Sequence, residues 1–305
     1  MKYNYGQTMT SIKDVESCYE RLEDEELKRI AKIAIENLSH VVVGLALPQA
    51  LLMESIRRNK RLNYIISASK SLKISLDTVL ESEKAKLFEV VEMRLKKESQ
   101  NITDDAIKLL DSFREVPLIE NAIRVQALNS LVNIWTIFES STKEIWKCLL
   151  NGHQNIFLNN ILKEGDNNEV EGISGKSISI DFLGKYNFNI NNKLGEILCE
   201  KYDFTSCHGI KKAFTDLQKK KKAKLIFIDN PILYNLEITR NLIVHNAGII
   251  DNKYLQKNST TNQTMGELLE ITIEKFNTYE EIMTKTLVGI FEYCEELLGS
   301  NAKDD

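Results

Sequence analysis

Helix-breaking residues are scarce in this chain, and their scarcity constrains its fold more than any other feature. The 305 residues include only three prolines and 13 glycines, the two residue types that most often end or interrupt a helix. Apolar residues recur at helical spacing over long stretches, and the hydrophobic share of 43% is enough to build a core. Charged residues, at 28%, argue against disorder. The sequence therefore predicts an all-α protein.

The apolar periodicity and the positions of glycine and proline place the expected helices. We expect helices at residues 11–44, 49–67, 76–97, 104–114, 117–150, 231–247 and 266–298. A break with a helix cap is expected at residues 101–105. The chain then divides into a helical N-terminal region, residues 1–115, with a regulatory or partner-binding role, and a C-terminal domain, residues 116–305.

The middle of the chain is its least regular stretch. Asn, Gly and Asp accumulate at residues 165–168, which is typical of a loop. Residues 177–181 alternate between polar and apolar like a short strand. We therefore expect a loop insertion or a small β-hairpin near residues 165–181.

No motif predicts a cofactor or a metal ion. Residues 172–177 resemble the tail of a phosphate-binding P-loop, but Val170 stands where that motif requires glycine, and no core strand precedes it. Cys207 and His208 lack a second pair of ligands at zinc-finger spacing. We therefore expect a protein that works with no metal and no cofactor.

Cysteine usage and hydropathy favour a cytoplasmic protein. The five cysteines are odd in number and scattered, which is typical of reduced thiols. Residues 1–10 are polar and do not resemble a signal peptide. The most apolar run, residues 41–53, contains Pro48 and is too short to cross a bilayer. We expect it to be a buried turn of helix and expect no association with a membrane.

The best-marked helix of the chain also carries its strongest functional signal. Asn230 is a favourable N-cap, Pro231 suits the first helical position, and Gly248 suits the left-handed residue after the last turn. These signals predict a helix over residues 231–247, about 25 Å long. Its core-facing stripe is expected to contain Ile232, Leu236, Ile243 and Ala247.

Arg240, Asn241 and His245 lie near the end of this helix and form a compact set for handling a phosphodiester. Arginine carries a permanent charge and a fork of donors that matches phosphate oxygens. Histidine titrates near neutral pH and can transfer protons. Asn241 and His245 are one turn apart on one face, with Arg240 about 100° to the side, so all three can line one groove. Because one helix cannot surround a substrate, we expect a second wall.

The run Thr239–Asn246, with its pattern of Arg, Asn, three residues and His, resembles the signature of HEPN domains. The resemblance covers residues 117–298 and implies an up-and-down helical bundle, to which the N-terminal region is an extension. Members of this family typically form homodimers in which the motif helices face each other, which would supply the second wall. Many are metal-independent endoribonucleases of toxin, abortive-infection, anti-phage and CRISPR systems.

The resemblance also implies roles for single residues. The ribose 2′-OH would attack the adjacent phosphorus and leave a 2′,3′-cyclic phosphate and a 5′-OH, with His245 as general acid or base. Arg240 would bind the scissile phosphate, and Asn241 would bond a phosphate oxygen or hold the tautomer of the histidine. Glu139 lies on a helix that resembles an earlier helix of the family, where an acidic residue can orient the motif arginine. Asn246 is expected to support the site.

A cluster of lysines precedes the motif helix and is expected to hold an RNA backbone without reading its sequence. The cluster comprises Lys211, Lys212, Lys219, Lys220, Lys221, Lys222 and Lys224. The alternative is a solvated loop with no ligand. The net charge of −4 does not indicate a general nucleic-acid binder, but a local patch suffices for an enzyme that touches few phosphates.

The sequence therefore predicts a cytoplasmic, homodimeric, metal-independent endoribonuclease of bacterial anti-phage defence or of a toxin–antitoxin system. RNA is its expected substrate, and an antitoxin or another defence protein is its expected partner. Two alternatives are a catalytically silent HEPN-fold adaptor, which binds a partner, and a module that senses a nucleotide without breaking a bond. A third is a surface arginine followed by a histidine that only interacts with the end of its helix.

Overall fold

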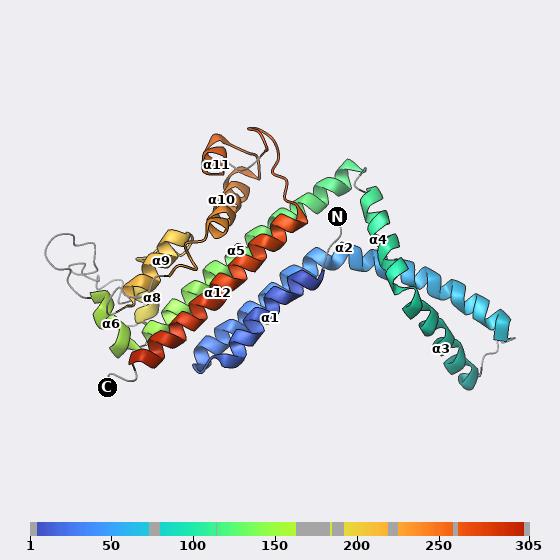
Figure 1. Ribbon diagram of the computed structural model, residues 1–305, viewed down its shortest axis with the longest axis horizontal. Helices are drawn as coiled ribbons and strands as arrows, with labels where there is room; N and C mark the ends of the chain where they lie inside the picture. Colours follow the sequence, from blue (N-terminus) through green and yellow to red (C-terminus); the bar gives the residue numbers. More distant parts are fainter. Residues whose placement is uncertain are drawn as a thin grey trace. The chain divides into compact units, whose positions relative to one another are not determined.

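The computed structural model describes residues 5–72, 80–113, 115–162, 184, 192–218, 225–258 and 262–301. Within these residues the regular elements are helices, and the one β-bridge pairs Ile249 with Leu268. The prediction of an all-α protein is confirmed. The loop or hairpin expected at residues 165–181 lies outside the described residues. The helices (Figure 1) are α1 (Tyr5–Arg21), α2 (Glu25–Leu72), α3 (Glu81–Lys97), α4 (Ser99–Phe113), α5 (Pro117–Gly152), α6 (Gln154–Leu162), α8 (Leu194–Cys199), α9 (Cys207–Asp216), α10 (Pro231–Asn246), α11 (Asn252–Lys257) and α12 (Ile273–Asn301).

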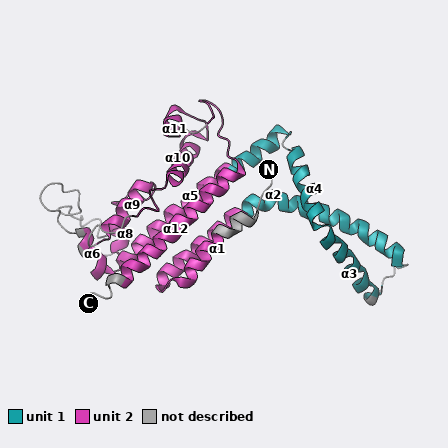
Figure 2. Cartoon of the chain, in the orientation of Figure 1, with its two compact units in different colours: residues 1–4, 43–127 teal, residues 5–42, 128–305 magenta. Residues whose placement is uncertain are grey.

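Two compact units make up the described chain, and their boundaries differ from the one expected near residue 115 (Figure 2). Unit 1 contains residues 43–127, and unit 2 contains residues 5–42 and 128–305. The first helix belongs to unit 2, because α1 packs along α12. α2 and α5 each continue from one unit into the other.

α2 is one continuous helix where the sequence predicts a break at Pro48. This proline lies inside α2, where its ring nitrogen cannot donate the usual backbone hydrogen bond to Gly44, four residues earlier. The side chain of Gln126 compensates, because its amide nitrogen donates to the carbonyl oxygen of Gly44. The helix therefore continues past the proline with that carbonyl satisfied.

The chain breaks instead between α1 and α2, inside the single helix expected at residues 11–44. Asp24 caps α2, since its carboxylate accepts hydrogen bonds from the backbone amides of Glu26 (3.0 Å) and Leu27 (2.9 Å). The carboxylate of Glu295, on α12, accepts from the amides of Glu23 (2.8 Å) and Asp24 (3.1 Å). These bonds fix the turn between α1 and α2 against α12.

The apolar run at residues 41–53 is only partly buried, contrary to the sequence expectation. Val42 and Leu45 are buried, whereas Val43, Leu47 and Leu51 are exposed. One window of α2 is long and apolar enough to cross a membrane by composition, and 33% of that window is buried. Core helices of soluble proteins meet the same criterion, so the window is weak evidence for a span.

Unit 1 packs α3 and α4 against the second half of α2 around a small apolar core. Its buried centre consists of Val91, Leu95 and Ile102, and α2 contributes Met53, Ile56, Tyr64 and Ile65. The break between α3 and α4 lies at Glu98, ahead of the break expected at residues 101–105. Lys60 of α2 donates to the Glu98 carboxylate at 3.0 Å, so this joint is tied to α2.

Unit 2 is built around aromatic side chains of α5. Trp135, Phe138 and Trp146 are fully buried, and Nε1 of Trp146 donates to the carbonyl oxygen of Ala213 on α9 at 3.0 Å. α10 contacts α9, α11 and α12, so the helix that carries the motif is supported from several sides. α12 begins at Ile273 rather than at residue 266, because the chain is still in a turn there.

α10 has the caps that the sequence predicts. The side chain of Asn230 accepts from the amide of Ile232 at 2.8 Å, and Pro231 opens the helix. The helix ends at Asn246, and Gly248 has a left-handed φ of 75°. The left-handed conformation of Gly248 is as predicted, but the helix ends one residue earlier than predicted, and Ala247 is left-handed as well, with a φ of 52°.

The buried face of α10 differs from the expected stripe. Of the four residues in that stripe, Leu236 is buried, Ile243 is half-buried, and Ile232 and Ala247 are exposed. The buried residues are Leu233, Leu236, Ile238, Thr239 and Leu242. Because α10 contacts three other helices, burial follows those contacts around much of its circumference, and a single stripe does not describe it.

We expect Gln126→Ala to lower the free energy of unfolding by about 1 kcal/mol, because the Gly44 carbonyl loses the donor that replaces the N–H missing from Pro48. In a Pro48→Ala background the same substitution should cost less, since residue 48 then supplies a backbone N–H. Urea denaturation of the four proteins measures this coupling. Equal costs in the two backgrounds would contradict the compensation.

Candidate functional site

The predicted motif residues lie together in one pocket of unit 2. Arg240, Asn241, His245 and Asn246 all line a pocket of about 440 Å³. His245 is exposed at its surface, whereas the side chain of Arg240 is only 17% exposed. The arginine side chain is therefore mostly buried in the pocket wall, whereas the histidine side chain is accessible to a ligand.

The second wall of this pocket comes from the same chain. The segment between α8 and α9 contributes Asp203, Thr205 and Ser206. α11 and the residue before it contribute Asp251, Lys253, Tyr254 and Lys257. Part of the enclosure expected from a second protomer is thus already present within one protomer.

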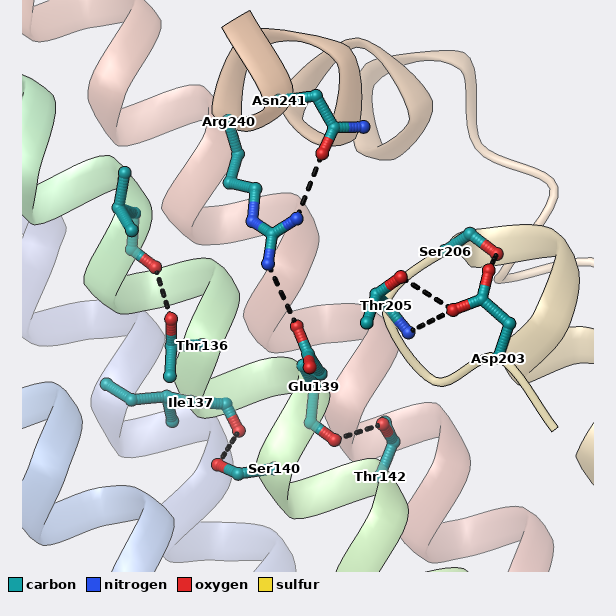
Figure 3. Close-up of polar contacts among 11 residues, drawn as sticks. Thr136, Ile137, Glu139, Ser140, Thr142, Asp203, Thr205, Ser206, Arg240 and Asn241 are labelled. Carbon is teal, nitrogen blue, oxygen red and sulfur yellow. Dashed lines mark hydrogen bonds and ion pairs between the residues drawn. The ribbon is translucent and has the colours of Figure 1, made fainter. Parts of the chain in front are cut away.

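Arg240 is fixed by two acceptors (Figure 3). Its Nη1 donates to Oδ1 of Asn241 at 2.9 Å, and its Nη2 donates to Oε2 of Glu139 on α5 at 3.3 Å. Nε of Arg240 is buried and has no hydrogen-bond partner among the described residues. The contact expected between Glu139 and the motif arginine is therefore present.

Burial makes Glu139 depend on this contact. Removal of the carboxylate from water raises its pKa, and the nearby charge of Arg240 acts in the opposite direction. The pair thus places a partly desolvated carboxylate against a partly desolvated guanidinium. Losing either partner would leave the other charge without its counterpart.

The other motif side chains have distinct surroundings. Asn241 uses its carbonyl oxygen for Arg240, so its amide group is the part left for a ligand. His245 makes no hydrogen bond or ion pair within the part of the chain that the structure describes. Asn246 donates from Nδ2 to the carbonyl oxygen of Ile249, which closes the turn after α10 and supports the site through the backbone.

Each acidic residue that lines the pocket is bonded to backbone or hydroxyl groups. Asp203 accepts from the amide of Thr205 (2.9 Å), its hydroxyl (2.6 Å) and the hydroxyl of Ser206 (2.7 Å) (Figure 3). Burial alone would raise the pKa of Asp203, but these bonds outweigh it and lower the pKa. Glu237 accepts from the amide of Cys207 at 2.8 Å, which places its charge at the start of α9.

The same arrangement holds for the third acid, Asp251. It accepts from the amide of Tyr254 at 2.7 Å and so caps α11. Asp203, Glu237 and Asp251 thus each accept hydrogen bonds from groups of the protein, and these bonds hold their carboxylates in place.

The described lysines of the predicted cluster, Lys211 and Lys212, are not part of the pocket wall. Lys211 pairs with Asp229 at 2.5 Å, and neither Lys211 nor Lys212 is among the lining residues. Lys219, Lys220, Lys221, Lys222 and Lys224 lie outside the described residues. The lysines that do line the pocket are Lys253 and Lys257, which the sequence analysis missed. Their signal is a helical spacing of four directly after the cap at Asp251.

Cys207 and its neighbours do not form a metal site. Burial, with the charge of Glu237, raises the pKa of the Cys207 thiol well above its usual value, so the thiol stays protonated. Among the described residues, no group of three or more His, Cys, Asp or Glu side chains could hold a metal ion. All five cysteines are free thiols.

A buried polar network holds the pocket walls together. Tyr279 of α12 donates to Oδ1 of Asn235 on α10 at 2.5 Å, and its hydroxyl lies 3.2 Å from that of Thr239. Asn235 donates to Asn258 at 2.9 Å, and Asn258 donates to the hydroxyl of Tyr254 at 2.8 Å. The network therefore connects α12, α10 and α11 behind the pocket.

Comparison with known proteins adds no relative. No protein-family model, curated protein or solved structure matches this chain. Functional inference therefore rests on the motif and on the geometry of the pocket.

Tyr279→Phe should lower the free energy of unfolding near pH 8 by about 1 kcal/mol, since Asn235 loses a buried hydrogen bond. Burial raises the pKa of Tyr279 well above its usual value, so wild-type stability falls as pH rises through about 10, where the unfolded tyrosine ionises. Between pH 8 and 10.5 the variant should lose about 0.8 kcal/mol less than wild type.

Urea denaturation at the two pH values measures this difference. Tyr234→Phe is the matched control, because Tyr234 is exposed on α10. An identical loss of stability in wild type and Tyr279→Phe would show that the Tyr279 hydroxyl is not protected by folding.

Proposed function

We propose that this protein is a metal-independent endoribonuclease and that the pocket around Arg240 and His245 is its active site. The observation that carries the proposal is the placement of a partly buried, oriented arginine and an exposed histidine in one open pocket. A phosphate needs a fixed positive group, and proton transfer needs a titratable group within reach of the reacting oxygens.

The reaction follows from the chemistry of these two groups. The ribose 2′-oxygen forms a bond to phosphorus as its proton leaves, and the bond from phosphorus to the 5′-oxygen breaks as that oxygen gains a proton. The products are a 2′,3′-cyclic phosphate and a 5′-OH. Arg240 binds the phosphate oxygens, where negative charge increases in the transition state. The amide of Asn241 supplies a further donor.

Two proton transfers call for two proton-transfer groups, and one pocket contains one histidine. A homodimer would bring a second His245 to the site. Exposed apolar side chains around the motif favour such a contact: Tyr234 and Val244 on α10, and Ile249 and Leu268 of the β-bridge that follows. We propose that this surface is the homodimer interface.

The biological setting follows the motif resemblance alone. We propose a cytoplasmic enzyme of bacterial anti-phage defence or of a toxin–antitoxin system, controlled by an antitoxin or another defence protein. The alternative is binding of a phosphate-rich nucleotide without cleavage. A pocket of about 440 Å³ with cationic and hydrogen-bonding groups is large enough for such a ligand.

The ribonuclease proposal predicts that purified full-length protein cleaves labelled RNA in EDTA and leaves 5′-OH ends. His245→Ala and Arg240→Ala should each lower the cleavage rate at least about 100-fold. His40→Ala is the matched control, because His40 is exposed on α2 and lies outside the pocket. Cleavage by both motif variants at the wild-type rate would place the active site elsewhere.

The same variants separate the alternatives. Nucleotide binding by calorimetry, with no RNA cleavage by wild type, would favour the sensing module. Expression in bacteria adds a second readout: toxicity and new 5′-OH ends in total RNA should disappear in both motif variants at equal protein levels. Toxicity that persists in both would contradict the proposed site.

The dimer proposal predicts that Val244→Glu separates the protomers and lowers the cleavage rate without unfolding the chain, because a charge would be buried at the interface. Size-exclusion chromatography with light scattering measures the mass. Val43→Glu is the matched control, since Val43 is similarly exposed in unit 1. A monomeric wild type, or a dimeric Val244→Glu protein, would contradict this interface.

A further inference from the structure

α11, which follows the motif helix in the sequence, contributes two lysines to the pocket. Lys253 and Lys257 are four residues apart, so their side chains lie one above the other on one face of the helix. Both line the pocket that also contains Arg240 and His245. Of the lysines predicted to bind RNA from the sequence, the two that the structure describes, Lys211 and Lys212, do not line it.

The acidic and the basic side chains around the pocket differ in whether they have partners within the protein. Asp203, Glu237 and Asp251 accept hydrogen bonds from backbone amides, so part of each negative charge is already offset. Lys253 and Lys257 are exposed and have no ion pair within the described part of the chain. Lys253 and Lys257 are therefore cations of this wall that no carboxylate of the described residues pairs with, which favours an anionic ligand beside them.

The position of the lysines is fixed relative to the motif. Tyr254, between them on α11, is 2% exposed, and its hydroxyl accepts from Asn258, which is bonded to Asn235 of α10. α11 and α10 thus share one buried network. The lysine side chains are flexible, but the backbone of α11 is already held in place. A ligand therefore does not have to order it on binding.

We propose that Lys253 and Lys257 form a second phosphate subsite, so that the pocket binds RNA across two consecutive phosphates. Arg240 holds the scissile phosphate, and the two lysines hold the phosphate next to it. This inference rests on the proposed function and deepens it by naming the substrate class. The phosphate and ribose groups of a flexible single strand can enter a pocket of about 440 Å³, so we assign single-stranded or looped RNA as the substrate class.

Equilibrium binding to an uncleavable RNA tests the subsite separately from catalysis. The probe is a short fluorescein-labelled 2′-O-methyl oligonucleotide, which lacks the attacking 2′-OH, and the readout is anisotropy over a range of salt concentrations. The double variant Lys253→Gln/Lys257→Gln is compared with Lys13→Gln/Lys32→Gln. Lys13 and Lys32 are exposed on α1 and α2, line no part of the pocket, and give the same change in net charge.

Loss of the α11 lysines should weaken binding about tenfold at low salt and reduce the slope of log K against log salt by about 0.7, since the two lysines hold one phosphate and each phosphate contact with a single strand contributes about 0.7. The control pair should bind as wild type does. In cleavage assays the α11 pair should mainly raise KM, whereas His245→Ala should mainly lower kcat. Circular dichroism and thermal melting confirm that each variant is folded.

The outcomes distinguish the subsite from the ribonuclease proposal. Wild-type affinity and salt slope in the α11 variant would overturn the subsite, even if the enzyme cleaves RNA. Lysine-dependent binding without any cleavage would overturn the ribonuclease proposal and support the subsite. Absence of probe binding by wild type would overturn the subsite, and absence of cleavage as well would overturn both. Equally tight binding of a double-stranded probe would overturn the assignment of the substrate class.

Discussion

The half-buried guanidinium of Arg240 is the group on which the arrangement of this site depends. A permanent charge that is only 17% exposed needs nearby acceptors, and Glu139 on α5 and Asn241 on α10 supply them. Glu139 is itself partly desolvated, so the two charges support each other. Their contact ties α10 to the aromatic core of α5 and points the arginine into the pocket. A lysine could not fill this position equally well, because it lacks the planar fork of donors.

The rest of the pocket is organised by polar groups that the fold has already satisfied. The acids at its edge cap helices or bind hydroxyls, and the Asn235–Tyr279 network fixes α11 against α10. Such fully bonded buried networks favour one arrangement over others, since any shift leaves a polar group unsatisfied. Among the titratable side chains that line the pocket, those without a partner in the described part of the chain are His245, Lys253 and Lys257, all of which can interact with a phosphate. The proposed chemistry therefore depends on which charged side chains are bonded within the protein and which can bind a ligand.

Local signals allowed accurate prediction of some elements and failed where distant residues decide. The ends of α10 were predictable because Asn230, Pro231 and Gly248 act on their own helix. The continuation of α2 through Pro48 was not, because the compensating donor, Gln126, is 82 residues away. The predicted stripe of α10 failed for a related reason: three neighbouring helices share its burial. In the site, Arg240, Asn241 and His245 were found from their spacing, whereas Lys253 and Lys257 carried no comparable signal.

The sequence by itself determined that the chain is helical, where the motif helix begins and ends, and that an arginine, an asparagine and a histidine share one stretch of it. These properties depend on residue types and spacings within a few turns, where local backbone preferences and capping act. Only the tertiary structure decided that α1 belongs with α12 and that α11 supplies part of the second wall. Those contacts join residues that are distant along the chain, and packing and the pairing of buried polar groups select them.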